Sequence, residues 1–390
     1  MSIFGVVCEF NPFHLGHKYL FDCARTMGAE KIICAMSGNA VQRGSLAVAD
    51  KYIRGESAVV SGADLVLELS YPWCAASAEY FAAASIKILS EFCDTVIFGS
   101  ECGDIDLLFR AASLAESRAF RESYAKRCAE GEGSAKVYFE LLSEGAGYEF
   151  SSNDLLGIEY IRAALRLDCA KSLKFVTVTR KGAAYRDKTA KESELPSATA
   201  IRELWREGNI DNSRGFMPEA VYEIMRGADM LGELTDEREL DGAVVSFFRL
   251  HTGEEIEAFA ECSGGLGNRI ATASRFATGV EELIGAVGTK RYTDARIRRA
   301  ILFAMTGVTE EILKSEPKYT CLLGASKGGR ELLSDLRRQE HIEIVTKAAD
   351  APKDFAQTVA AEKLDALFTL ARKNKAEACS VMKKSAYVEK

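Results

Sequence analysis

The sequence is poor in the patterns that build disulfide, zinc or membrane frameworks. Its eleven cysteines are scattered singly with no Cys-x-x-Cys pair, which argues against a disulfide network or a structural zinc site. No apolar run approaches the length of a membrane span, and the N-terminus lacks the basic and apolar regions of a secretory signal. We therefore expect a globular, cytoplasmic protein with no membrane partner and no stable protein partner.

A net charge of -7 excludes a protein coated with basic patches. Basic residues nevertheless gather late in the chain, where residues 288–302 carry five of them against a single acidic residue, Asp294. Such a run is usually a solvated helix face. Contact with the phosphates of a nucleic acid is the alternative, since a local positive stripe is enough for it.

The chain of 390 residues is long enough for two domains. Apolar segments without polar alternation, separated by helical patterns, are typical of buried parallel strands. We expect strands at 2–8, 31–36, 64–69, 95–99 and 174–179, and helices at 17–27, 49–61 and 76–92. This order predicts an α/β fold: a Rossmann-like, doubly wound parallel sheet with right-handed crossovers.

Helical patterns dominate from about residue 236, interrupted by short strand-like runs at 319–323 and 342–345. We therefore predict a sheet domain over residues 1–230 and a mainly helical C-terminal domain over residues 231–390. The boundary between the two domains is not sharply defined by the sequence, because no Pro- or Gly-rich linker separates the sheet-forming part from the helical part.

Polar segments follow the first four predicted strands, at residues 11–17, 37–44, 68–72 and 99–101. Each alone is ordinary turn chemistry. Because ligands bind outside the carboxyl ends of the strands in such sheets, four polar segments at one edge indicate a binding site there.

Two of only four histidines lie in the first of these segments, as His14-Leu15-Gly16-His17. Metal ligation or chance would explain a bare histidine pair. After a first strand, however, imidazole donors can neutralise the charge that develops as phosphorus is attacked, and the glycine allows close approach of the backbone. The position favours a clamp for nucleotide phosphates.

A second anion-binding pattern, Ser197-Ala198-Thr199-Ala200-Ile201-Arg202, opens a helix after the fifth strand. Hydroxyls at a helix N-terminus with an arginine one turn later combine donors, dipole and charge. Taken alone, this pattern is explained equally well by Ser197 acting as a simple helix N-cap.

With these two elements the chain resembles the nucleotidyltransferase superfamily with an HxGH motif. Further segments match one family within it, the bacterial tRNA(Met) cytidine acetate ligases, over roughly residues 1–330. The matching segments are 9–17, 36–44, 62–69, 98–101, 153–160, 265–269, 289–293 and 323–324. A KMSKS loop is absent, and Ser45-Leu46-Ala47 lacks the acid-proline pair expected after Arg43-Gly44.

The resemblance implies a two-step acetyl transfer. Acetate attacks the α-phosphate of ATP to give acetyladenylate and pyrophosphate. The exocyclic amine of the wobble cytidine of elongator tRNA(Met) then attacks the acetyl carbonyl, releasing AMP and leaving N4-acetylcytidine. ATP and tRNA are thus the implied partners, with Mg²⁺ bridging phosphate oxygens and no protein side chain assigned to the metal.

The resemblance also implies residue roles, with His14 and His17 as the catalytic pair. The implied ATP contacts are Val7, Cys8, Glu9, Phe10, Asn11, Pro12, Phe13, His14, Leu15, Gly16, His17, Lys18, Tyr19, Leu20, Gly99, Asn153, Arg180, Ser197, Thr199 and Arg202. Gln42 and Arg43 are expected to face acetate or cytosine. The residues expected to contact tRNA are Lys290, Arg291, Arg296 and Arg299.

Two other functions remain open at this point. An adenylyltransferase acting on a phosphorylated cofactor precursor would share the ATP half-site without needing the basic helical region. A non-catalytic, nucleotide-responsive RNA-binding protein would keep the basic region, although the intact His14, His17 and Arg202 speak against lost catalysis.

Overall fold

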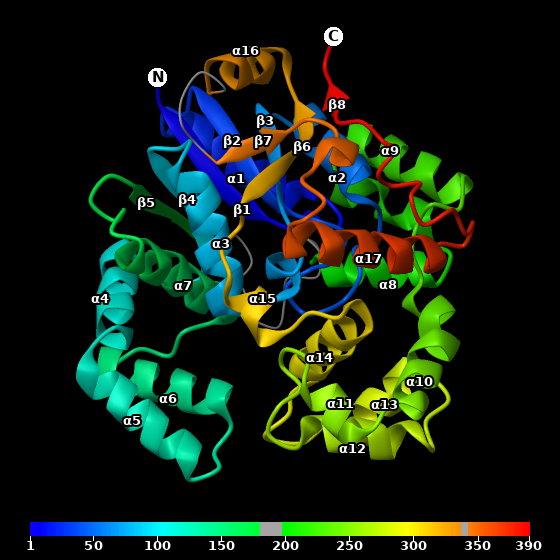
Figure 1. Ribbon diagram of the computed structural model, residues 1–390. Helices are drawn as coiled ribbons and strands as arrows, with labels where there is room; N and C mark the ends of the chain where they lie inside the picture. Colours follow the sequence, from blue (N-terminus) through cyan, green and yellow to red (C-terminus); the bar gives the residue numbers. More distant parts are fainter. Residues whose placement is uncertain (180–196, 337–341) are drawn as a thin grey trace.

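An eight-stranded sheet forms the centre of the protein (Figure 1). The computed structural model describes residues 1–179, 197–336 and 342–390. The strand order is β5-β4-β1-β2-β3-β6-β7, and β8 pairs with β6. The strands are β1 (Ile3–Cys8), β2 (Lys31–Ser37), β3 (Leu65–Leu69), β4 (Thr95–Ser100), β5 (Lys174–Thr179), β6 (Tyr319–Ala325), β7 (Glu343–Val345) and β8 (Tyr387–Val388).

Strands β1 to β5 are all parallel, and the predicted doubly wound fold is confirmed. The chain moves outward from β1 to β3, returns past β1 to β4, and continues to β5. The order therefore reverses between β1 and β4. Ligands of such sheets bind at the carboxyl ends of the strands beside this reversal.

Strand β6 runs antiparallel to β3. The sheet is therefore mixed, whereas the sequence predicted a wholly parallel one. The reason is the path of the chain, which reaches β6 from the helical region and not through a crossover from a neighbouring strand. Leu322 pairs with Leu67 and the later Ala325 with Leu65, so β6 enters at the carboxyl end of β3. The helical region thus adjoins the edge where ligands bind.

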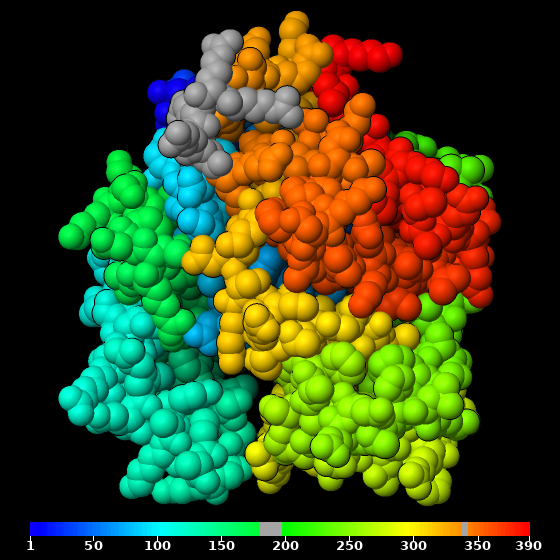
Figure 2. Space-filling model, viewed as in Figure 1, coloured from blue at the N-terminus to red at the C-terminus, as the bar shows by residue number. Residues whose placement is uncertain are grey.

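Helices cover the sheet and extend below it in two groups, one formed by α5 and α6 and the other by α10 to α14 (Figure 1). Figure 2 shows a hollow between the two groups on the face in view. The helices are α1 (Leu15–Thr26), α2 (Lys51–Val60), α3 (Ala78–Ser90), α4 (Ile105–Ala115), α5 (Arg118–Ala129), α6 (Ser134–Ala146), α7 (Ser152–Arg166), α8 (Ala198–Arg206), α9 (Glu219–Met230), α10 (Asp241–Leu250), α11 (Gly253–Glu257), α12 (Leu266–Ser274), α13 (Val280–Val287), α14 (Asp294–Thr306), α15 (Glu310–Lys314), α16 (Lys327–Leu336) and α17 (Ala356–Leu370).

Short 3₁₀ turns complete the connections at η1 (Trp73–Ala75), η2 (Ile210–Phe216), η3 (Glu237–Leu240) and η4 (Ala348–Asp350). In the described parts of the chain, no helix has both the length and the apolar character to cross a bilayer. The division into residues 1–230 and 231–390 stays a prediction, and the second range contributes β6, β7 and β8 to the sheet of the first.

A buried charge cluster ties α17 to the sheet. The Lys51 ammonium lies 2.9 Å from Glu68 Oε1 and 3.7 Å from Asp365 Oδ2, and all three side chains are at least 95% buried. Asn39 Nδ2 donates to the other Asp365 oxygen at 2.7 Å. Burial raises the pKa of Asp365 to about 6, although the Lys51 charge opposes the shift.

This raised pKa predicts how stability changes with pH. Because folded Asp365 holds its proton more tightly than in the unfolded chain, its contribution is complete below about pH 4 and is lost as pH rises through about 6. Asp365→Asn is expected to remove this loss, which amounts to about 3 kcal/mol. Urea unfolding of both proteins between pH 4 and 7 measures it. Glu207→Gln, at an exposed carboxylate, is the control, and parallel pH curves for Asp365→Asn and wild type would contradict the prediction.

Candidate active site

The histidine pair caps the helix that follows β1. His14 is the N-cap of α1, and its Nδ1 accepts the Gly16 N–H at 3.0 Å. His17 Nδ1 accepts the His14 N–H at 3.2 Å, and the two rings stack with centroids 3.7 Å apart. Because each Nδ1 accepts a backbone N–H, each neutral ring carries its proton on Nε2. The two rings thus share one tautomer and one cap at the start of α1.

Buried aromatic rings hold this pair in place. The rings of Phe10 and Phe13 lie 4.9 and 5.4 Å from the His17 ring, and both phenylalanines are almost fully buried. Phe10 has φ of 44°, a left-handed conformation. For a residue with a Cβ this conformation costs about 1–2 kcal/mol. Strain of this kind, fixed by packing, is typical of functional loops.

A cavity of about 430 Å³ lies at the reversal between β1 and β4. Its walls join the carboxyl end of β1, the end of β4, the first turns of α7 and the loop after β2. Its lining includes ten of the residues named from the sequence: Val7, Cys8, Glu9, Phe10, His17, Leu20, Gln42, Arg43, Gly99 and Asn153. The apolar walls and few polar groups are those of a small-molecule site.

The other residues named between 11 and 19 shape the loop and do not line this cavity. Asn11 is buried, and its Oδ1 accepts the Val48 N–H at 2.7 Å. Phe13 belongs to the core, and Lys18 pairs with Asp22 on the surface of α1. The remaining residues of this segment outside the lining are Pro12, His14, Leu15, Gly16 and Tyr19.

A carboxylate absent from the sequence-based candidates ties the β4 loop to α7. Asp154 Oδ1 accepts Ser100 Oγ–H at 2.6 Å and the N–H groups of Glu101 and Cys102 at 2.9 and 3.1 Å. Burial acts to raise the pKa of Asp154, but these hydrogen bonds outweigh it and the pKa is lowered. The neighbouring Asn153, which lines the cavity, donates to Glu101 Oε1 at 2.5 Å.

Arg54 of α2 joins the loops after β1 and β2 and was missed by the sequence analysis. Its guanidinium is fully buried and donates to the carbonyl oxygens of Glu9 at 2.7 Å, Ser37 at 3.0 Å and Ala49 at 2.9 Å. It also donates to the Gly38 carbonyl. No local sequence signal marks this role, because a single arginine within a helical pattern is ordinarily expected on a solvated face.

The carboxylate of Glu9 adds a further link between these loops. Its Oε1 accepts the Gln42 N–H at 2.9 Å. Burial raises the pKa of Glu9, while this hydrogen bond and the charges of Arg202, Arg54 and Arg43 oppose the rise. The ends of β1 and β2 are therefore one hydrogen-bonded unit.

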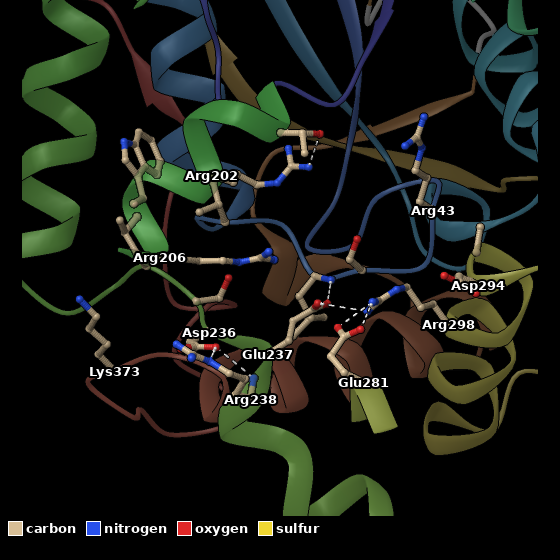
Figure 3. A pocket seen from close by; sticks show the side chains of 18 of the residues that line it. Arg43, Arg202, Arg206, Asp236, Glu237, Arg238, Glu281, Asp294, Arg298 and Lys373 are labelled. Carbon is tan, nitrogen blue, oxygen red and sulfur yellow. Dashed lines mark hydrogen bonds and ion pairs between the residues drawn. The ribbon is translucent and has the colours of Figure 1, made fainter. Parts of the chain in front are cut away.

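A larger cavity of about 710 Å³ adjoins the first, and Arg43 lines both (Figure 3). Thr199 and Arg202 of α8 form one wall of it. Arg202 Nη1 donates to the Asn11 carbonyl at 2.6 Å, and its Nη2 contacts Thr199 Oγ1 at 3.1 Å. The structure thus brings the two anion-binding elements of the sequence together. Ser197 Oγ caps α8 by accepting the Ala200 N–H.

Gly44 holds the loop that carries Arg43 against α14. Its φ is +79°, and a Cβ there would lie 2.5 Å from the Arg299 nitrogen. Only glycine allows this approach without strain. The close approach sets the position of Arg43 between the two cavities.

The basic residues expected to contact RNA divide into two kinds. Lys290 and Arg291 are exposed. Arg296 and Arg299 instead pair with Glu261, at 3.6 and 3.0 Å, and are mostly buried. Arg298, left out of the candidates, lines the larger cavity. Arg180 lies outside the described residues.

Within residues 1–179, 197–336 and 342–390, no group of three or more histidine, cysteine, aspartate or glutamate side chains is arranged to hold a metal ion.

A Rossmann-like sheet with a His-x-Gly-His turn at its reversal defines a nucleotidyltransferase. The model of the HIGH Nucleotidyl Transferase family matches residues 1–381. Within this class, the chain belongs to the tRNA(Met) cytidine acetate ligase family. The protein of that name from Clostridium perfringens is 32% identical, covering 91% of this chain and 92% of its own, and that from Acetivibrio thermocellus is 33% identical over 90% and 89%. The resemblance seen in the sequence is confirmed.

A solved structure agrees with this assignment. The crystal structure of Thermotoga maritima TmcAL bound with alpha-thio ATP superposes with a TM-score of 0.88, at 29% identity and over the full length of both chains.

Proposed function

We propose that this protein is an ATP-dependent ligase that joins acetate to the wobble cytidine of elongator tRNA(Met). An acetate oxygen attacks the α-phosphorus of ATP, and pyrophosphate leaves. The cytosine N4 amine then attacks the acetyl carbonyl, AMP leaves with the C–O bond electrons, and one N–H proton is lost. The product is N4-acetylcytidine.

The observation that carries the proposal is the His14–His17 pair that caps α1 at the reversal of the sheet, with Arg202 of α8 bound to the Asn11 carbonyl of the same turn. Adenosine fits the smaller cavity, between the backbone of Gly99 and Asn153. Its phosphates then reach His14 and His17, whose donors stabilise the charge that grows at the α-phosphorus. Thr199 and Arg202 then bind the β- and γ-phosphates.

The proposal also assigns roles toward Mg²⁺, acetate and the tRNA backbone. Mg²⁺, if bound with ATP, would need no protein side chain as a ligand, since it prefers oxygen ligands and keeps several waters, and it would offset phosphate charge. Gln42 and Arg43 lie where the two cavities meet, a position from which they face acetate or the incoming cytosine. The exposed Lys290 and Arg291 are proposed to contact the tRNA backbone.

Two assays test the proposal. Exchange of labelled pyrophosphate into ATP is expected to depend on acetate, and mass spectrometry of elongator tRNA(Met) incubated with protein, ATP and acetate is expected to show a single added acetyl group. Exchange supported by a phosphorylated cofactor precursor but not by acetate would identify another adenylyltransferase. Binding of tRNA without exchange or acetylation would indicate the non-catalytic RNA-binding protein.

A further inference from the structure

The larger cavity has more walls than the proposed triphosphate uses. Thr199 and Arg202 form one side of it. The remaining sides come from residues 43–48, residues 229–238, the starts of α13 and α14, and Lys373, none of which carries a proposed ATP contact. At about 710 Å³ it has the size of a cavity that accepts a whole small molecule.

The cations of this cavity differ in what they already contact. Arg238 pairs with Asp236 and Lys373 with Asp229, while Arg202 donates to the Asn11 carbonyl. Arg43 and Arg206, by contrast, have no hydrogen bond or ion pair with any described residue.

Arg206 follows Arg202 by four residues, so the two side chains share one face of α8. Figure 3 shows both extending from α8 into the cavity, with Arg43 on the opposite side of it.

The wall away from α8 is rich in carboxylates. Glu281 holds Arg298 through bonds of 2.6 and 2.8 Å, and Glu237 Oε2 lies 3.7 Å from the same guanidinium. Glu237 Oε1 accepts the Leu46 N–H at 2.7 Å. Arg298 offsets the charge of these carboxylates, but a carboxylate oxygen can still accept a hydrogen bond from the amino group of a base. The cavity therefore combines cations for phosphodiesters with acceptors for a nucleobase.

We infer that the larger cavity receives one RNA nucleotide turned out of its strand. Arg206 neutralises a phosphodiester beside it, and Glu237 accepts a hydrogen bond from the exocyclic amino group of the base. An unpaired loop base reaches such a chamber without melting a duplex. The inference rests on the proposed function and adds Arg206 and Glu237 to it.

Arg206→Ala separates RNA binding from ATP binding. It is expected to raise the KM for tRNA about tenfold and to reduce the slope of log affinity against log salt by about 1. Acetate-dependent ATP–pyrophosphate exchange without tRNA is expected to change by less than about twofold. Arg226→Ala, at a surface arginine of α9 paired with Glu223, is the matched control.

The opposite outcomes overturn the inference. A tenfold fall in exchange would place Arg206 on the triphosphate, and an unchanged KM for tRNA would remove the nucleotide from this cavity. Absence of acetate-dependent exchange in the wild-type protein would instead refute the proposed function and not this site.

Glu237→Gln tests the base contact, since the amide keeps an acceptor oxygen for the Leu46 N–H. Exchange is expected to be unaffected and acetylation of saturating tRNA to slow about tenfold. Equal acetylation rates for the variant and wild type would exclude Glu237 as the acceptor.

Discussion

Replacing His17 by alanine is expected to lower the rate of acetate-dependent ATP–pyrophosphate exchange by about 10²–10³-fold. That is the usual cost of removing one pre-positioned donor from a site where charge develops. His17 lines the smaller cavity, and its Nδ1 accepts the His14 N–H, so the neutral ring carries its proton on Nε2. Single-turnover measurement at saturating ATP isolates this chemical step.

The expected pattern of constants distinguishes catalysis from binding. Since the donor acts mainly on the transition state, kcat should fall far more than the affinity for ATP. His251→Ala is the matched control, because that histidine stacks on Phe247 at the end of α10 and lines neither cavity. A variant that keeps its kcat but loses ATP affinity would make His17 a binding residue only.

Arg54→Met is expected to lower the free energy of unfolding by about 3–5 kcal/mol, the range for buried carbonyl groups that lose a charged donor. Methionine keeps the aliphatic length but none of the donors to Glu9, Ser37, Gly38 and Ala49. Burial lowers the pKa of Arg54 to about 10, so the side chain is still charged at neutral pH. Urea unfolding at pH 7 measures the change.

Arg118→Met provides the comparison, since Arg118 is 89% exposed on α5 and pairs with Glu122 on the surface. Its removal should cost no more than about 0.5 kcal/mol. A folded Arg54→Met protein should also bind ATP more weakly, because the loops after β1 and β2 lose their common donor. A loss in stability below about 1 kcal/mol would show that other groups satisfy these carbonyls.

The parallel half of the sheet was predictable because strands β1 to β4 are buried on both faces. Residues 3–8 and 31–37 are almost wholly apolar, and the alternation with helices leaves few alternatives to a doubly wound order. The contact between the histidine turn and α8 was also predictable, because both follow the carboxyl ends of strands in a sheet that binds its ligands there.

Features that depend on the path of the chain were not predictable from local patterns. Nothing in residues 319–325 shows that they pair with β3, or that they do so in the antiparallel direction. The side chain of Arg54 looks like part of a solvated helix face until the turns above it are known. Arg298 and Arg299 are adjacent in sequence, yet one faces the larger cavity and the other Glu261.

The pairing of β6 with β3 has a consequence for synthesis on the ribosome. β3 ends at Leu69, but its outer partner begins only at Tyr319. During translation of the intervening residues, the nascent chain presents an apolar strand edge that is open to wrong pairing. At elongation rates of about 5–20 residues per second, that edge stays uncovered for roughly 10–50 seconds. We therefore expect newly made chains, more than finished ones, to depend on chaperones.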